Sequence, residues 1–275
     1  MPDEPDETPA MMASHTRTDF GIALKALPIV VAVVLAKFGM DQLGWDSVEL
    51  NALYSGLVAA NVFLVGFLLA GTLADYKESE KLPGELAGRV KTIADECQIL
   101  YRAKQAPAAR ACLEHLAALA SDIDNWLHGR VGVEIPLDRL DGLNGYFLEF
   151  EQLTQPNFIV RLKQEQSALR LLVIRINTIK ETSFVGAGYL VAEATSLLLI
   201  VALLMAEVAQ LPAELFLIGA IAFLLTYMIL LIRDMDDPFD FDHDGQRGAA
   251  EVSLAPLEYL EETLARDLAS LDGHG

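Results

Sequence analysis

Four long apolar runs alternate with polar segments along the chain. They are Phe20–Met40, Leu50–Leu73, Phe184–Val208 and Leu211–Ile232. Each run is long enough to cross a bilayer core as a helix, which takes about 20 residues. Short loops separate the first run from the second and the third from the fourth. The pattern therefore predicts two transmembrane helical hairpins, which occupy residues 20–76 and 183–232 and are surrounded by membrane lipid.

The region between the hairpins, residues 77–182, carries apolar residues at helical spacing and is divided by proline and glycine. It predicts four helices, at Glu85–Ala103, Pro107–Leu127, Pro136–Leu153 and Asn157–Thr182. A proline in the first turn and a glycine after the last turn are typical helix boundaries. No alternating stretch is long enough to predict a strand. The predicted fold class is all-α, with four transmembrane helices in two hairpins and a helical domain between them.

The two ends of the chain are acidic. Residues 1–19 are rich in proline and acidic side chains, which predicts a disordered tail and not a signal peptide. Residues 233–275 form an acidic C-terminal segment that contains one amphipathic stretch, Val252–Leu271. Its apolar face consists of Leu254, Leu257, Leu260, Leu264 and Leu268. We expect a protein partner or another subunit to cover this face.

Lysine and arginine are distributed unevenly about the apolar runs. They follow the second run, precede the third and end the fourth, whereas the loops Asp41–Glu49 and 209–212 have none. The positive-inside rule therefore places both termini and the middle region in the cytoplasm, as in a bacterial inner-membrane protein. Lys37 lies near the opposite side of the membrane, where we expect it to snorkel from the end of its helix.

Composition excludes several classes of function. A formal net charge of −19 argues against binding to nucleic acid. Cys97 and Cys112 are predicted to be reduced thiols, and their spacing matches no zinc or redox motif. The sequence contains no readable nucleophile–histidine–acid set, phosphate loop or Cys/His cluster. An enzyme is therefore the least favoured class.

An acidic turn follows the last apolar run and fits the calcium-loop template of alternating aspartates, a glycine and a final glutamate. Calcium prefers six to eight oxygen ligands, which such a loop directs toward one point. The expected ligands are the side chains of Asp240, Asp242, Asp244 and Glu251 with the carbonyl of Gln246. Against this interpretation, Arg247 occupies a position that is usually apolar, and acidic runs are commonly just solvated. Calcium is therefore one of two interpretations.

Two features of the apolar runs are candidates for function. Phe63 and Phe67 lie one turn apart in the second run, on a face that otherwise carries small residues. In a ring of subunits they would form apolar collars, which gate by dewetting; alternatively, small residues pack helices together and the phenylalanines face lipid or core. Glu193 lies inside the third run, either as a functional intramembrane carboxylate or in a wet crevice near the cytoplasmic end.

The second run and its exit, GFLLAGTLADYKESEKLPG, resemble the matching region of bestrophins, above all the divergent bacterial bestrophin-like group. In that group a Gly-Phe in the pore helix precedes a Glu-x-x-Lys-Leu-x-Gly stretch, which Gly66-Phe67 and residues 78–84 match. Asp237-Pro238-Phe239 resembles the turn after the last bestrophin span. Leu254–Leu257 resembles the Leu-Pro-Leu element that lies beyond that turn.

The resemblance implies a homopentamer whose second span lines a pore for small inorganic ions. It places the pore neck at Phe63 and Phe67, with Ala59 one turn above, and puts the acidic turn where animal bestrophins bind calcium. Two departures leave the choice between anions and cations open. Asp75-Tyr76-Lys77-Glu78 replaces an Arg-Trp-rich stretch, and Ala59 is smaller than the usual neck residue.

The sequence is thus interpreted as that of an oligomeric bestrophin-like ion channel with an apolar neck. Two alternatives stay open. A non-conducting scaffold or sensor would use the acidic tail to recruit a partner. A stator-type proton-driven motor subunit would share the two hairpins around a helical domain, but the polar, proline-containing spans expected of it are not evident.

Overall fold

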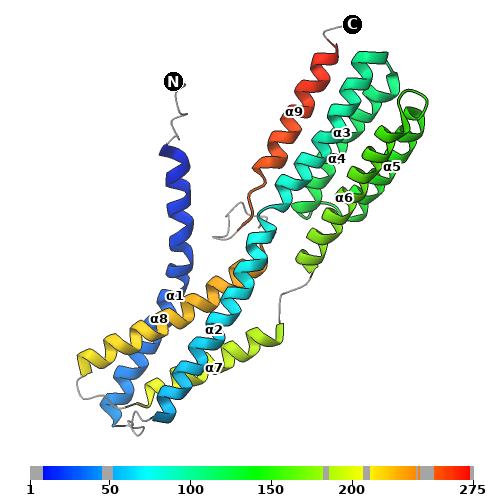
Figure 1. Ribbon diagram of the computed structural model, residues 1–275. Coiled ribbons are helices and arrows are strands. Elements are labelled where there is room, and N and C mark those ends of the chain that lie inside the picture. Colours follow the sequence, from blue (N-terminus) through cyan, green and yellow to red (C-terminus); the bar gives the residue numbers. More distant parts are fainter. Residues whose placement is uncertain are drawn as a thin grey trace, which may run out of the picture. The chain divides into compact units, whose positions relative to one another are not determined.

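A computed structural model describes residues 9–44, 52–181, 186–206, 211–239, 241 and 251–272. The regular elements of these residues are α-helices, which confirms the predicted all-α class (Figure 1). In chain order they are α1 (Pro9–Leu43), α2 (Ala52–Ser79), α3 (Leu82–Lys104), α4 (Pro107–Leu127), α5 (Glu134–Phe150), α6 (Pro156–Glu181), α7 (Gly186–Leu204), α8 (Leu211–Asp236) and α9 (Ala255–Asp272).

The described helices form two compact units, and their boundary in α2 falls between Tyr76 and Lys77. We call them the apolar unit and the amphipathic unit. The apolar unit contains α1, α7, α8 and α2 as far as Tyr76. The amphipathic unit contains α3 to α6, α9 and the segment that begins at Pro238.

Three helices of the described chain are long and apolar enough to cross a membrane: α1 from Gly21, α2 and α8. The apolar part of α7 described here, Gly188–Leu204, is shorter. The number of four spans therefore stays a prediction.

The structure also differs from the sequence interpretation at the N-terminus, because α1 begins at Pro9 and continues through residues that we expected to be disordered. Proline is tolerated in the first turn of a helix, and no glycine or second proline interrupts the chain before Phe20.

The helices of the apolar unit are held together by two clusters of buried side chains. One joins Val65 and Leu68 of α2 to Ala192 of α7 and Ile232 of α8. The other joins α7 and α8 through Leu199, Leu203, Ile218 and Leu225. Large apolar side chains also cover the outside of the single chain, among them Leu24, Leu190 and Phe216. Such an outer surface is suited to contact with lipid or with other subunits.

The amphipathic unit is a bundle of α3, α4, α5, α6 and α9 (Figure 1). Helix α4 has the predicted boundaries, and its predicted apolar face is buried at Leu113, Leu116, Leu119 and Ile123. Helix α5 begins two residues before its predicted start, at Glu134. The predicted continuation of α6 into the next span falls at residues 182–185, outside the described residues. Helical periodicity thus identified this core, because each helix buries one stripe.

The apolar face of α9 is covered by the chain's own bundle. Leu257, Leu260 and Leu264 are buried, and α9 packs on α3 and α4. Lys91 of α3 adds an ion pair with Asp267 of α9, with 3.2 Å between Lys91 Nζ and Asp267 Oδ2. The expectation that a partner or another subunit is needed to cover this face is therefore wrong for these leucines. Periodicity shows that a face must be buried but does not show against what.

We expect Leu264→Ala to lower the free energy of unfolding by about 2–5 kcal/mol, because the fully buried side chain leaves a cavity between α9 and the bundle. Leu268→Ala is the matched control, since Leu268 is on the same helix but only half-buried. Thermal unfolding of the full chain in detergent, with limited proteolysis to detect release of α9, measures both variants. Equal effects of the two substitutions would contradict the assigned docking of α9.

Candidate functional site: the two faces of α2 and buried polar contacts

Helix α2 has two distinct faces in the single chain. Asn61, Val65, Leu68 and Thr72 are buried, and their spacing of three or four residues places them on one side of the helix. This side contacts α7 and α8. The opposite side consists of apolar and small residues that are exposed in the single chain. The sequence pattern singled out the face of Phe63 and Phe67 by its small residues, but it did not show which face of α2 is buried, because α2 is apolar all round.

The three residues predicted to form the neck all lie on the exposed face of α2. Phe63 is 76% exposed and Phe67 is 66% exposed, and Ala59 is also exposed. Gly66 lies between the two phenylalanines, and a Cβ atom added there would have no neighbour within 4 Å. The phenylalanine rings therefore project from a face that no part of the described chain covers. Their role as a neck stays a prediction.

A cluster of polar side chains joins the buried face of α2 to α7. Asn61 Nδ2 donates a hydrogen bond of 3.1 Å to Ser196 Oγ, and Thr195 Oγ1 donates one of 2.7 Å to Asn61 Oδ1. Asn61 and Ser196 are buried. Both ends of the Asn61 amide are thus used. An asparagine in an apolar run is the signal that the sequence offered for this cluster, but its partners lie on a helix far along the chain.

Glu193, the predicted intramembrane polar site, forms an ion pair with Arg233 near the end of α8. The Glu193 side chain is 34% exposed and the Arg233 side chain is 59% exposed. The carboxylate is therefore paired and partly accessible in the single chain. The role of Glu193 therefore stays a prediction.

The acidic turn lies mostly outside the described residues. Asp240, Asp242, Asp244 and Gln246 are not described, and Glu251 is the one predicted ligand whose placement is known. Within the described part of the chain, no three His, Cys, Asp or Glu side chains lie close enough together to hold a metal ion. The calcium site therefore stays a prediction.

The two flanks of the acidic turn are fixed close to each other. The backbone N–H of Val252 donates a hydrogen bond of 3.0 Å to the Pro238 carbonyl. Phe239 is buried, and the Phe241 ring lies 5.3 Å from the His128 ring at the end of α4. The base of the turn is thus anchored in the amphipathic unit on both sides.

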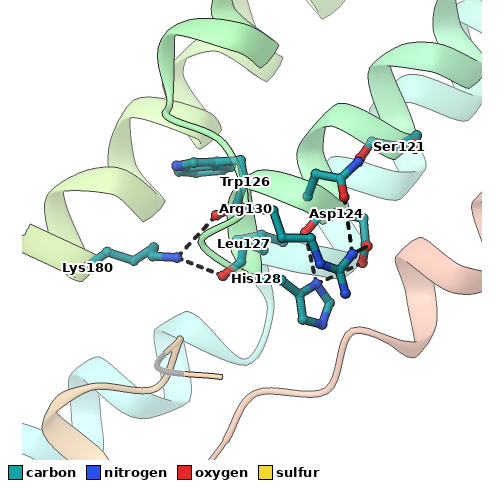
Figure 2. A network of polar contacts seen from close by, with 8 residues as sticks. Ser121, Asp124, Trp126, Leu127, His128, Arg130 and Lys180 are labelled. Carbon is teal, nitrogen blue, oxygen red and sulfur yellow. Dashed lines mark hydrogen bonds and ion pairs between the residues drawn. The ribbon is translucent and has the colours of Figure 1, made fainter. Parts of the chain in front are cut away.

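The end of α4, against which Phe241 lies, is braced by a polar network (Figure 2). Lys180 of α6 donates hydrogen bonds to the Leu127 carbonyl at 2.8 Å and to the Trp126 carbonyl at 3.4 Å. Arg130 donates to the Asn125 side chain at 3.1 Å. The Lys180 bond to Leu127 satisfies a backbone carbonyl in the last turn of α4, where carbonyl groups lack intrahelical partners.

Comparisons with known proteins identify this architecture. No protein-family model matches the chain, and no curated protein matches it significantly. Among solved structures, a single-residue variant of a bacterial bestrophin homolog from Klebsiella pneumoniae is similar, with 16% sequence identity and a TM-score of 0.72 over 92% of this chain and 98% of that one. A second structure of a Klebsiella pneumoniae homolog, obtained by Zn-SAD phasing, has 15% identity and a TM-score of 0.69 over 92% of this chain and 97% of that one.

The chain has the bestrophin fold. The similarity extends over nearly all of the homologs' length and confirms the architecture that the resemblance implied. At such low identity it establishes the fold alone, so the functional residues of this bestrophin fold must be argued from its own contacts.

Within its bestrophin fold, this chain contains a buried ion pair that the sequence interpretation missed. Lys37 of α1 is fully buried, and its Nζ lies 2.8 Å from Oε1 of Glu214 on α8. Lys37 Nζ also donates a hydrogen bond of 2.7 Å to the Ala206 carbonyl, just beyond the end of α7. The expectation that Lys37 snorkels is therefore wrong, because its ammonium group has carboxylate and carbonyl partners inside the unit. The sequence signal for this ion pair was the presence of Lys37 near the end of the first apolar run and of Glu214, with the opposite charge, near the start of the fourth.

We expect Lys37→Met or Glu214→Leu to destabilise the protein by about 3–5 kcal/mol, because each leaves one buried charge without its partner. The double variant should cost less than the sum of the single variants, since both charges are removed together. Lys25→Met, which changes an exposed lysine of the same helix, is the control and should stay within about 0.5 kcal/mol. Thermal unfolding in detergent compares the four variants. Additive losses would show that the pair is not coupled.

Proposed function

We propose that the chain forms an oligomeric ion channel of bestrophin-like type in the bacterial inner membrane. The observation that carries the proposal is the exposed face of α2, with Phe63 and Phe67 projecting from it, in a chain with the bestrophin fold. The proposed assembly is a homopentamer around a central pore, with both termini and the amphipathic unit in the cytoplasm. We propose that small inorganic ions permeate this pore.

The physical argument concerns what can cover the exposed face of α2. In a ring, this face would point toward the central axis, and the two phenylalanines of each subunit would form two stacked collars. A narrow constriction lined by apolar side chains opposes water and ions by dewetting. Small residues such as Ala59 and Gly66 on the same face would keep the pore wider next to the collars. Conduction would then depend on a slight widening at Phe63 and Phe67.

We also propose that the acidic turn binds calcium and links it to conduction. The support is the anchored base of the turn, where the Val252 N–H bonds to the Pro238 carbonyl and Phe241 lies against His128. A loop whose ends are already held together loses less conformational entropy when its ligands converge on an ion. Ordering the turn would fix the segment that leads into α9, and this would bias the neck between two states.

We expect the double variant Phe63→Ala/Phe67→Ala to raise ion flux by about tenfold or more, because removal of the collars lowers the dewetting barrier by about 1.4 kcal/mol for each factor of ten. Flux is measured in liposomes with potassium, sodium and chloride gradients. The set of gradients also ranks cations against anions.

Phe216→Ala is the matched control for this experiment. Phe216 is a phenylalanine of α8 that is 74% exposed, so it matches Phe63 in chemistry and exposure but lies on another helix. We expect its flux to equal that of the parent protein. Equal changes in both variants would contradict a neck at Phe63 and Phe67. Absence of flux from a folded, oligomeric protein would favour the scaffold or motor-subunit interpretation.

We expect Asp240→Ala and Asp244→Ala to abolish calcium binding and any calcium dependence of flux, since each removes a carboxylate ligand from the proposed loop. Isothermal titration with calcium measures binding directly, and liposome flux with and without calcium measures the response. Asp138→Ala is the control, because it removes an exposed carboxylate from the amphipathic unit outside the turn. An unchanged calcium response in the turn variants would refute the proposed site.

A further inference from the structure

We propose that Asn61 is a positioning residue that sets the rotation of α2 about its own axis. Its hydrogen bonds to α7 keep Phe63 and Phe67 on the exposed face of the helix. The inference rests on the proposed function, since it assigns to Asn61 control over the residues of the proposed neck. It concerns the orientation of the phenylalanines and not the presence of a pore.

The place of Asn61 on α2 suits this role. An α-helix turns by about 100° per residue, so Phe63 points about 160° away from Asn61 around the helix. Val65, Leu68 and Thr72 lie on the side of Asn61 and are buried with it. A bond that holds Asn61 against α7 therefore holds the phenylalanines on the far side.

Apolar packing by itself specifies the rotation of α2 only weakly. Val65 and Leu68 pack on Ala192 and Ile232, but lipid tails are as apolar as these partners. Turning an apolar face toward lipid therefore costs little. Polar contacts are different, because a buried amide that loses its partners in an apolar environment cannot replace them with water.

The exposed face of α2 is apolar around the phenylalanines. Around the phenylalanines it carries Ala59, Val62, Gly66 and Ala70, whose side chains cannot form hydrogen bonds. On α7, by contrast, Thr195 and Ser196 bind the amide oxygen and nitrogen. The rotation seen in the structure is thus the one that satisfies Asn61.

The Thr195 hydroxyl has a second hydrogen-bond acceptor besides Asn61, which makes substitution of Asn61 a usable test. The Thr195 hydroxyl has a single proton, and it lies 2.8 Å from the Val191 carbonyl of its own helix as well as 2.7 Å from Asn61 Oδ1. Without Asn61, Thr195 can donate to Val191. Asn61→Leu therefore leaves the Thr195 hydroxyl with a partner, whereas the buried Ser196 hydroxyl loses its bond to Asn61.

The orientation of α2 is measured by thiol labelling. Phe63→Cys and Leu64→Cys are each prepared in the parent protein and in Asn61→Leu, and the rates of modification by a water-soluble thiol reagent are read by mass spectrometry. Position 64 lies about 100° around the helix from position 63 and is packed against the apolar cluster of α2 and α7. The ratio of the two rates reports rotation, and it does not require flux.

The two native cysteines contribute little background. Cys97 and Cys112 are buried in the amphipathic unit. The hydrogen bond with Cys97, together with burial, raises the pKa of the Cys112 thiol. Because the thiolate is the reactive species, a buried thiol with a raised pKa reacts slowly.

We expect the ratio of the labelling rate at position 63 to that at position 64 to fall by about fivefold to tenfold in Asn61→Leu. This is the fold-change that corresponds to the loss of about one interhelical hydrogen bond. The exchange Asn61→Ser/Ser196→Asn keeps an amide and a hydroxyl facing each other and should restore the ratio. Thr226→Val is the control, because it removes a buried hydroxyl from α8 and should leave the ratio unchanged. If Asn61→Leu yields no folded protein, Ser196→Ala, which removes one partner, replaces it.

An unchanged ratio in the variant that removes the Asn61–Ser196 contact would overturn the inference, and so would a fall that the exchanged pair does not reverse. A separate result decides the proposed function. If modification of the thiol at position 63 in the parent background leaves ion flux unaffected, the neck assignment fails, whatever the labelling ratio shows.

Discussion

The arrangement of the apolar unit depends on a few buried polar contacts, because apolar side chains in a bilayer do not distinguish a neighbouring helix from lipid. Among the described residues, two of the most buried of these contacts join different helices. The Asn61 amide links α2 to α7, and the Lys37–Glu214 pair links α1 to α8 and to the end of α7. If the helices joined by either contact moved apart, buried polar groups would lose their partners. These contacts therefore select one arrangement of the helices from several that apolar packing alone would leave at similar free energy.

The amphipathic unit is organised by the opposite rule. Its helices bury one apolar stripe each and expose polar residues, so removal of apolar surface from water selects the packing. Helix α9 follows this rule, since its leucines are covered by α3 and α4 of the same chain. The docking of α9 also accounts for the anchored end of the acidic turn, which leads through Val252 into this helix.

The exposed face of α2 connects the fold to the proposed channel. The described part of one chain does not cover this face, although it bears two phenylalanines. A ring of subunits would turn this feature into collars around an axis, and Asn61 would keep the collars aligned. The Glu193–Arg233 pair joins the first half of α7 to the last turn of α8.

The sequence by itself determined the helices of the amphipathic unit and the buried faces of α4 and α9. Helix α4 has its predicted boundaries, and the leucines of α9 lie on the predicted face, because helical periodicity and proline or glycine boundaries are local properties. Only the tertiary structure decided the partners: α9 on its own bundle, Lys37 with Glu214, and Asn61 with Thr195 and Ser196. Within the nearly uniform apolar runs, periodicity could not show which face of α2 is buried against other helices. That face is defined by contacts between residues far apart in the chain, which no local pattern encodes.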